Sequence, residues 1–193
     1  MNVQTIEDLF VEQIQDLYDA EQRLVKALPK MAEASTNSEL RSEFEDHLQQ
    51  TQGHVQRLEQ VFAELGQDPK KETCEAMKGL IKEGEEMMDI EPPAIRDAAL
   101  IAAANRVEHY EIAAYGTART LATSLGLNQS PRLLEQTLDE EKKADAKLTQ
   151  IAEQTVNQQA MRPKTRHARQ PKRQRGSLTG GADGFVCLFP FTL

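Results

Sequence analysis

Apolar residues recur every three or four positions over most of the first 158 residues, and this spacing constrains the chain more than any other feature. It places the apolar side chains along one face of a helix. Aromatic residues make up only 5% of the sequence, whereas the helix-favouring types Glu, Gln, Ala, Leu and Lys are abundant. We therefore expect an all-α protein.

Capping residues and helix breakers divide this pattern into four long helices and one short helix. Thr5 is a predicted N-cap with Asp8 three residues beyond it, and Ser130 before Pro131 is a second predicted N-cap. Pro29 is expected to kink or shorten the first helix. The expected helices span residues 5–33, 38–65, 72–88, 93–126 and 131–158.

The lengths of the connections predict how these helices are arranged. Short loops join the first long helix to the second and the third to the fourth, so each pair is expected to form an antiparallel hairpin. Residues 67–92 form a connection as long as a bundle helix, which lets the second and third long helices run parallel. The pattern therefore predicts a ferritin-like four-helix bundle with a long crossover that carries an additional short helix.

Charge divides the chain into a body, residues 1–160, and a tail, residues 161–193. The chain has 23 basic and 31 acidic residues, of which the tail holds seven and one, so the body keeps 16 and 30 and a net charge of -14. The tail has no apolar stripe and is Gly-rich over residues 176–184, so we expect it to be disordered. It is either a basic arm for anionic partners or a segment foreign to the domain, and we favour the second interpretation.

Composition also limits partners and location. An acidic body disfavours nucleic acid and anionic membranes as main partners, so nucleic acid could bind only through the basic tail. Cys74 and Cys187 are the only cysteines and suggest no disulfide framework. The N-terminus lacks the features of a signal peptide, and no stretch is long and apolar enough to span a bilayer. We expect a protein of the reducing cytoplasm.

Each of the four long apolar stripes is interrupted near its middle by polar residues, mostly of types that bind metals. Antiparallel hairpins bring these interruptions to a similar level, because each residue adds a rise of about 1.5 Å along a helix. Thr51 and Asn105 are as readily hydrogen-bonding spacers as ligands. The predicted metal ligands are Glu21, His47, His54, Glu108, Glu111, Glu141 and Asp145.

The types of these residues indicate which ions they would bind. No Lys or Arg lies on the four stripes, so a bound cation or protonation must compensate the buried carboxylates. Carboxylates with imidazoles suit Fe or Mn, with Zn as a further candidate. Two ions are expected, because carboxylates can bridge and four of them offset roughly four positive charges.

Each residue also has a plainer interpretation when it is taken alone. A single Glu at a predicted core position is often a surface residue whose helical phase is misassigned. His47 or His54 alone is more often a hydrogen-bonded core histidine than a ligand. Asp145 could pair with Lys142, and Glu140 is expected to be solvated. The coincidence of interruptions on four helices favours a metal site over these separate explanations.

Several segments resemble the YciF/YciE family of ferritin-like stress proteins, also described as a domain of unknown function. The most specific is Glu108-His109-Tyr110-Glu111-Ile112, which follows the alanine-rich run of residues 96–104. The other segments are residues 5–10, 17–21, 47–62 and 138–142, and all lie within residues 2–157.

This resemblance implies a dimeric ferritin-like bundle with a di-metal centre and a role in stress responses, but no established reaction. Ferritin-like proteins in general provide Glu and Glu-x-x-His, each twice. In this sequence Thr51 stands where a Glu would precede His54, and Ala144 stands where a His would follow Glu141. The ligand set is therefore poorer than that of a typical ferroxidase.

Three functions follow from these features. The first is a di-iron or di-manganese protein that handles oxygen or peroxide, or sequesters iron, during stress, with Tyr18 or Tyr110 near the metals. The second is a non-catalytic helical homodimer, a structural or protective module whose central polar residues form a hydrogen-bonded network. The third is a protein that associates with nucleic acid through its tail. Whether the chain is an enzyme stays open at this point.

Overall fold

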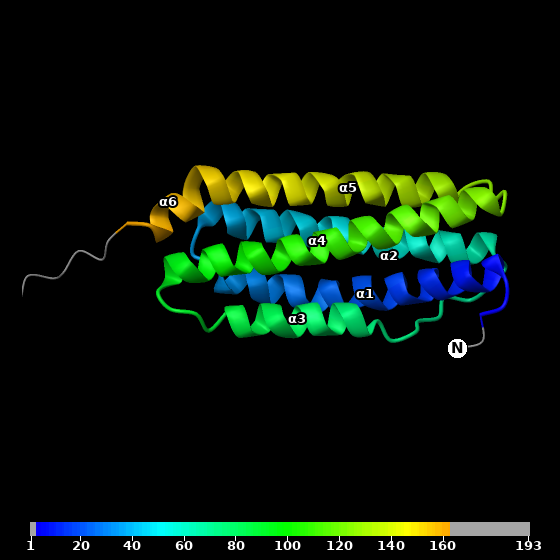
Figure 1. The fold of residues 1–193 in the computed structure, drawn as a ribbon, viewed down its shortest axis with the longest axis horizontal. Helices are drawn as coiled ribbons and strands as arrows, with labels where there is room; N and C mark the ends of the chain where they lie inside the picture. The colour runs from blue at the N-terminus through cyan, green and yellow to red at the C-terminus, as the bar shows by residue number, and fades with distance from the viewer. Residues whose placement is uncertain (1–2, 163–193) are drawn as a thin grey trace, which may run out of the picture. The chain divides into compact units, whose positions relative to one another are not determined.

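The computed structural model describes residues 3–162, and within them the chain is helical and contains no strand (Figure 1). The all-α prediction is confirmed. The elements are α1 (Ile6–Ala34), α2 (Ser38–Glu64), α3 (Glu75–Met87), α4 (Pro93–Ser124), α5 (Ser130–Ile151), the π-helical turn η1 (Ala152–Val156) and α6 (Asn157–Ala160).

The four long helices pack side by side as two antiparallel hairpins. α1 pairs with α2 and α4 pairs with α5, while α2 also packs on α5 and α1 on α4. The crossover between α2 and α4 carries α3, which lies along α1 and also contacts α4 (Figure 1). It returns the chain to the end where α2 began, so α2 and α4 run parallel. This is the ferritin-like connectivity that the loop lengths predict.

Most helix ends follow local sequence signals. Thr5 and Asp8 form a capping box at the start of α1, and Gly66 and Gly126 take positive φ angles of 65° and 70° just after α2 and α4. The prediction that Pro29 would shorten the first helix is wrong, since α1 continues to Ala34. Burial of the surrounding turns outweighs the backbone hydrogen bond that a proline removes.

Two other predicted helix starts need correction. The N-cap of α5 is Gln129 rather than Ser130, because the Ser130 hydroxyl donates instead to Glu64 of α2, at 2.6 Å. The short helix starts at Glu75 rather than at residue 72, and Cys74 caps it by accepting a hydrogen bond from the backbone N–H of Met77 at 3.3 Å. A contact between distant residues therefore sets the start of α5, and a thiol cap sets the start of α3.

The core consists of two apolar clusters with a polar belt between them. One cluster surrounds Phe44 and Leu100, and the other surrounds Phe10 and Phe62. On each long helix the two clusters occupy opposite ends, and the residues that separate them include Glu21, His47, Thr51, His54, Glu108, Glu111 and Glu141, all of them buried. The predicted convergence of the four interruptions at one level is therefore present in the fold.

The predicted tail after residue 160 lies outside the described residues, apart from the exposed Met161 and Arg162. Across residues 3–162, no helix combines the length and the apolar composition that crossing a lipid bilayer requires.

Candidate metal centre

Six of the seven predicted ligands meet in the polar belt, and all four long helices contribute. The most exposed of the six is His47, at 4%. α4 supplies two of them because Glu108 and Glu111 are three residues apart and therefore lie on one face. The six residues are Glu21 from α1, His47 and His54 from α2, Glu108 and Glu111 from α4, and Glu141 from α5.

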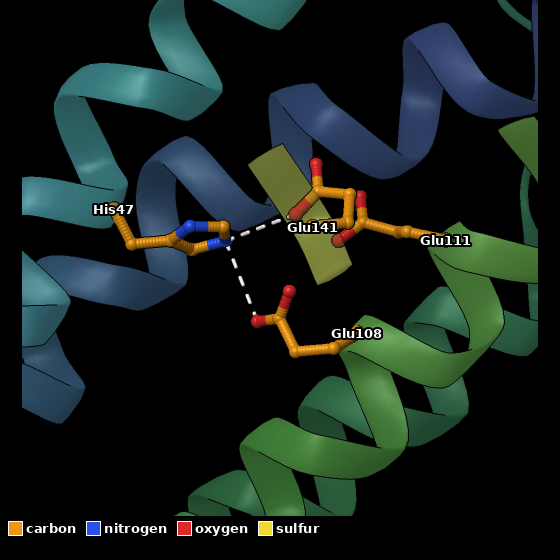
Figure 2. A group of neighbouring side chains, drawn as sticks. All are labelled: His47, Glu108, Glu111 and Glu141. Carbon is orange, nitrogen blue, oxygen red and sulfur yellow. Dashed lines mark ion pairs between the residues drawn. The ribbon is translucent and has the colours of Figure 1, made fainter. Parts of the chain in front are cut away.

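The first group of potential ligands contains His47, Glu108, Glu111 and Glu141. Each offers one ligand atom, and these atoms all lie within 4.8 Å of one another. The Nε2 atom of His47 is 3.5 Å from Oε1 of Glu108 and 3.7 Å from Oε2 of Glu141. Figure 2 shows the imidazole of His47 pointing from α2 toward the three carboxylates. One imidazole and three carboxylates thus surround a common point.

The second group contains Glu21, His54 and Glu141, whose ligand atoms lie within the same 4.8 Å limit. The Nδ1 atom of His54 is 2.9 Å from Oε1 of Glu141 and 3.4 Å from Oε1 of Glu21. Glu141 therefore belongs to both groups, with one oxygen near each histidine. A carboxylate in this position can bridge two ions.

Burial and mutual repulsion set the protonation of the carboxylates. The pKa of Glu108 is raised well above its ordinary value by burial and by the nearby charge of Glu141, and the pKa of Glu111 is raised by burial and by Glu21. Burial also acts to raise the pKa of Glu141, but hydrogen bonding to His54 and the charges of both histidines lower it overall. Glu108 and Glu111 therefore tend to bind protons, which neutralise carboxylates that lack a cationic partner.

The second histidine compensates part of the charge. Burial alone would lower the pKa of His54, but the charge of Glu21 and the hydrogen bond to Glu141 raise it to about 11. Within residues 3–162, none of the six residues forms an ion pair with a Lys or an Arg. Four buried carboxylates therefore face at most two imidazolium charges.

Several buried ligand atoms have no hydrogen-bond partner among the described residues. They are both carboxylate oxygens of Glu111, Oε2 of Glu21, Oε2 of Glu108, and both ring nitrogens of His47. Unpartnered buried polar atoms are rare because each costs free energy. A cation at each group would satisfy oxygen and nitrogen atoms together, so this set of buried carboxylates and imidazoles could hold metal ions.

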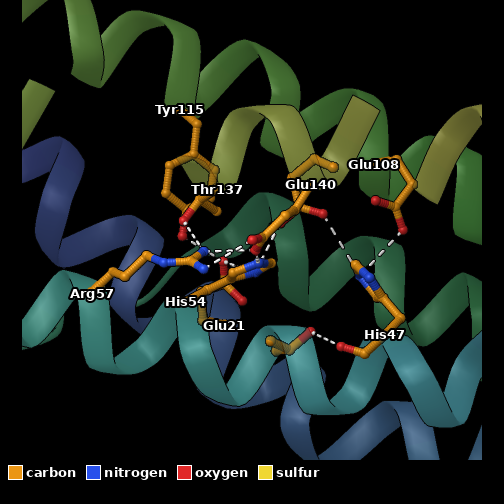
Figure 3. Close-up of polar contacts among 10 residues, drawn as sticks. Glu21, His47, His54, Arg57, Glu108, Tyr115, Thr137 and Glu140 are labelled. Atoms are coloured by element: carbon orange, nitrogen blue, oxygen red, sulfur yellow. Dashed lines mark hydrogen bonds and ion pairs between the residues drawn. The ribbon is translucent and has the colours of Figure 1, made fainter. Parts of the chain in front are cut away.

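A second layer of residues behind His54 was not predicted from the sequence. The Nε2 atom of His54 is 2.8 Å from Oε2 of Glu140, and Arg57 donates two hydrogen bonds to Glu140, at 2.6 and 2.9 Å (Figure 3). Arg57 also donates to Thr137 at 3.1 Å. Burial acts to raise the pKa of Glu140, but Arg57 and His54 lower it overall. The expectation that Glu140 is simply solvated is wrong, because α5 turns it toward α2.

These contacts orient the histidine. In the metal-free protein the raised pKa of His54 keeps protons on both ring nitrogens, with Nε2 facing Glu140 and Nδ1 facing Glu21 and Glu141. Loss of the Nδ1 proton would leave a lone pair directed at the two carboxylates. Such a carboxylate partner behind a ligating imidazole is a common feature of metal sites. The sequence signals that could have indicated this contact are that Arg57 lies about one helical turn beyond His54 and that Glu140 directly precedes Glu141.

The tyrosine that touches the centre is Tyr115, rather than the predicted Tyr18 or Tyr110. Its hydroxyl donates to Oε1 of Glu21 at 2.5 Å. Tyr18 instead donates to Glu59, and the hydroxyl of Tyr110 contacts Asp16 and Cys74. In the sequence, Tyr115 lies at apolar spacing between Ile112 and Ala118, a position typical of a core aromatic ring, so its hydroxyl gives no separate signal.

Asp145 is not part of either group. Its side chain is 25% exposed, accepts a hydrogen bond from Asn105 at 3.0 Å, and lies 3.3 Å from Nε2 of His109. Both partners are on α4 and draw the carboxylate to the edge between α4 and α5. Thr51 donates to the backbone carbonyl of His47 within α2, at 2.9 Å, which agrees with a spacer.

Comparisons with known proteins cover almost all of the described bundle. A family model described as "Domain of unknown function (DUF892)" matches residues 5–161. Protein YciF of Escherichia coli K12 is 48% identical over 162 residues, which is 83% of this chain and 98% of that protein. The crystal structure of the E. coli stress protein YciF matches with 46% identity and a TM-score of 0.77, covering 80% of this chain and 99% of that one.

Two further solved structures are similar. YcfI of Rhodopseudomonas palustris, which is provisionally described as a structural protein, matches with 46% identity and a TM-score of 0.75 over 77% of this chain and 95% of that one. A two-domain protein of Anabaena variabilis, with DJ-1/ThiJ/PfpI-like and ferritin-like domains, has 14% identity and a TM-score of 0.51. That match covers 93% of this chain and 42% of that chain, and it shows the fold alone.

Proposed function

Because this chain belongs to the DUF892 family, for which these comparisons supply no reaction, we propose a function from the residues at the centre of its bundle. The predicted resemblance to YciF is confirmed, and the fold is ferritin-like. We propose that the chain is a stress protein that holds two iron or manganese ions between its four long helices. Those ions would serve in oxygen or peroxide handling or in iron sequestration.

The proposed ligands divide between two positions. His47, Glu108 and Glu111 would hold one ion, Glu21 and His54 would hold the other, and Glu141 would bridge them. Bound iron or manganese would supply one-electron redox chemistry, which these side chains cannot carry out themselves. Asp145, a predicted ligand, is left out of the proposed set because it belongs to neither group of converging ligand atoms and its Oδ1 atom contacts Asn105 and His109 of α4.

Other residues prepare the centre for these ions. Tyr115 donates to one oxygen of Glu21 and leaves the other free to bind. Arg57 holds Glu140 against His54, so that the imidazole turns its Nδ1 atom toward the carboxylates. The apolar clusters on both sides of the belt exclude bulk water and so strengthen the attraction between carboxylates and cations.

One observation carries the proposal. Four fully buried carboxylates from three helices converge on two histidines, without a Lys or Arg partner in residues 3–162 and with unpartnered oxygen atoms facing inward. A structural polar network is expected to satisfy its own atoms. This network does not, and a pair of cations would complete it.

Metal analysis after purification without chelators tests the proposal. We expect about two Fe or Mn ions per chain in the wild type and almost none in the variant Glu108→Ala/Glu141→Ala. The control Glu135→Ala/Asp139→Ala, which removes two acidic side chains of α5 that belong to neither ligand group, should keep the wild-type content. Aerobic oxidation of added Fe(II), followed by absorbance, should be faster with wild type than with the first variant. A wild type that stays metal-free after addition of Fe(II) or Mn(II) would refute the proposal.

The alternative is a non-catalytic helical module. The provisional description of the R. palustris relative as a structural protein favours it. The raised pKa values of Glu108 and Glu111 also favour it, since protonation can neutralise these carboxyls. This alternative predicts that wild type and the Glu108→Ala/Glu141→Ala variant are both metal-free and fold equally well.

A further inference from the structure

A groove on the outside of the bundle, between α1 and α3, is lined mainly by basic side chains. Its volume is about 410 Å³, within the size range of small-ligand sites. The basic residues that line it are Arg23, Lys26, Lys30, Lys71, Lys78 and Lys82. They are six of the 16 basic residues in the first 160, so the groove concentrates positive charge on an otherwise acidic protein.

The helical register brings these charges together. Arg23, Lys26 and Lys30 lie three and four residues apart on α1, and Lys78 and Lys82 lie four apart on α3, so each set shares one face of its helix. α3 packs along α1 and sets the two faces beside each other. Lys71 adds a further charge from the connection that leads into α3.

The acidic residues of the groove neutralise only part of this charge. Asp19 is buried, lies 2.5 Å from Nε of Arg23 and 3.4 Å from Nζ of Lys71, and accepts the backbone N–H of Cys74 at 2.9 Å. Burial acts to raise the pKa of Asp19, but the hydrogen bonds from Arg23 and Cys74 lower it overall. Asp19 thus stays ionised and fixes the start of α3 against α1.

Only two of the other four basic side chains of the groove have an acidic partner among the described residues. Glu85 accepts a hydrogen bond from Lys30 at 2.9 Å, and Lys78 pairs with the exposed Glu75 at 3.0 Å. Lys26 and Lys82 form no ion pair within residues 3–162. Six basic and two acidic side chains therefore line one concave surface, where like charges repel one another unless an anion enters.

We propose that this groove binds a compact oligophosphate, either free or as the phosphate chain of a nucleotide. Lysine ammonium groups are flexible point charges that suit phosphate oxygens, whereas planar carboxylates are better matched by free arginine forks. The one arginine of the groove is held by Asp19. An anion with several adjacent charges can contact lysines of both helices at once, which a singly charged anion cannot do. The proposal does not depend on the metal centre.

Titration calorimetry at low ionic strength tests it, with inorganic tripolyphosphate and ATP as separate probes. The full chain is first freed of metal, because oligophosphates chelate metal ions. We expect one binding site per chain and an affinity that falls steeply as salt is added. Equal binding of both probes identifies the phosphate chain as the recognised group, whereas much tighter binding of ATP shows that the nucleoside contributes as well.

Matched variants locate the site. Lys26→Glu/Lys82→Glu should weaken tripolyphosphate binding by roughly tenfold or more, and Lys26→Gln/Lys82→Gln should lie between it and wild type. The control Lys142→Glu/Lys143→Glu makes the same change in net charge on exposed positions of α5 and should bind nearly as wild type does. Absence of binding to wild type, or an equal loss in the control, would overturn the proposal. Because the substituted lysines are exposed, circular dichroism should show folded protein throughout.

Discussion

At the scale of single residues, the two histidines of the centre differ in how firmly they are held. The Nε2 atom of His54 contacts Glu140, and Arg57 donates two hydrogen bonds to the same carboxylate. Both ring nitrogens of His47 lack a hydrogen-bond partner among the described residues. The ring orientation of His54 is therefore more firmly fixed than that of His47.

This difference predicts the effect of Glu140→Gln. The amide is a weaker acceptor than the carboxylate, so the variant should bind one of the two ions about tenfold more weakly and leave the other nearly unchanged. Calorimetric titration with Mn(II) measures both affinities. Asp139→Asn, at an exposed neighbouring position, should behave as wild type. Equal weakening of both ions, or of neither, would contradict the assigned role of Glu140.

Metal binding should also depend on pH. Because burial raises the pKa of Glu108 and Glu111 well above the ordinary 4.5, both carboxyls hold protons in the metal-free protein at a pH where exposed carboxyls have lost theirs. A metal ion must displace these protons, so affinity rises with pH and binding releases protons. Calorimetry in buffers of different ionisation enthalpy measures the number released. Because His54, whose pKa is about 11, also releases one proton when it binds a metal, a release of one proton or fewer at neutral pH would contradict this protonation state of Glu108 and Glu111.

At the scale of elements, buried or partly buried acidic residues fasten the loops at the two ends of the bundle. Asp97 of α4 accepts the backbone N–H groups of Thr36 and Asn37 between α1 and α2, both at 2.9 Å. At the other end, Glu64 of α2 accepts the N–H groups of Asn128 at 2.6 Å and Ser130 at 2.7 Å. Each contact ties one hairpin to the other and so fixes the level at which the polar residues meet.

Glu64→Gln should therefore lower the free energy of unfolding by about 1 kcal/mol. Burial acts to raise the pKa of Glu64, but its hydrogen bonds to Ser130 and the preceding amides lower it overall. A lowered folded-state pKa contributes stability above the ordinary value of 4.5, and that stability is lost as the pH falls through the folded-state pKa. Urea unfolding should thus show a difference from wild type at neutral pH that shrinks in acid. Glu45→Gln, at an exposed position of α2, is the control.

The fold could be predicted from the sequence because its signals are local. The capping box at Thr5 and the glycines at 66 and 126 act within a few residues, as does the apolar period. The failures involve partners distant in the chain: Glu64 withdraws Ser130 from its capping role, and Arg57 draws Glu140 inward. Asp145 had the right phase to face the centre, but α4 offers it competing partners at the edge of the bundle.

At the scale of the whole molecule, the polar belt divides the core and leaves buried carboxyls without partners. When folding raises the pKa of a carboxyl, the folded protein loses stability as the pH rises from the ordinary pKa of that group toward its raised pKa. The metal-free bundle should therefore be less stable at neutral pH than its apolar clusters alone would allow.

The predicted homodimer and the predicted cytoplasmic location stay predictions.

Glu111→Leu tests this cost. Both oxygens of Glu111 are buried and without hydrogen-bond partners in the described part of the chain, so an apolar side chain should stabilise the metal-free protein by about 1 kcal/mol. Thermal unfolding at neutral pH should show a higher melting temperature for the variant without metal. Added Mn(II) should raise the melting temperature of wild type more than that of the variant. A lower metal-free melting temperature for the variant would argue that Glu111 serves the fold rather than a metal.

Crystals soaked in Mn(II) provide the most direct test of the centre, because anomalous scattering locates the ions without reference to activity. The account predicts two anomalous peaks inside the bundle, one among His47, Glu108, Glu111 and Glu141 and one among Glu21, His54 and Glu141. Peaks confined to the acidic surface, with the six side chains hydrogen-bonded to water, would contradict it.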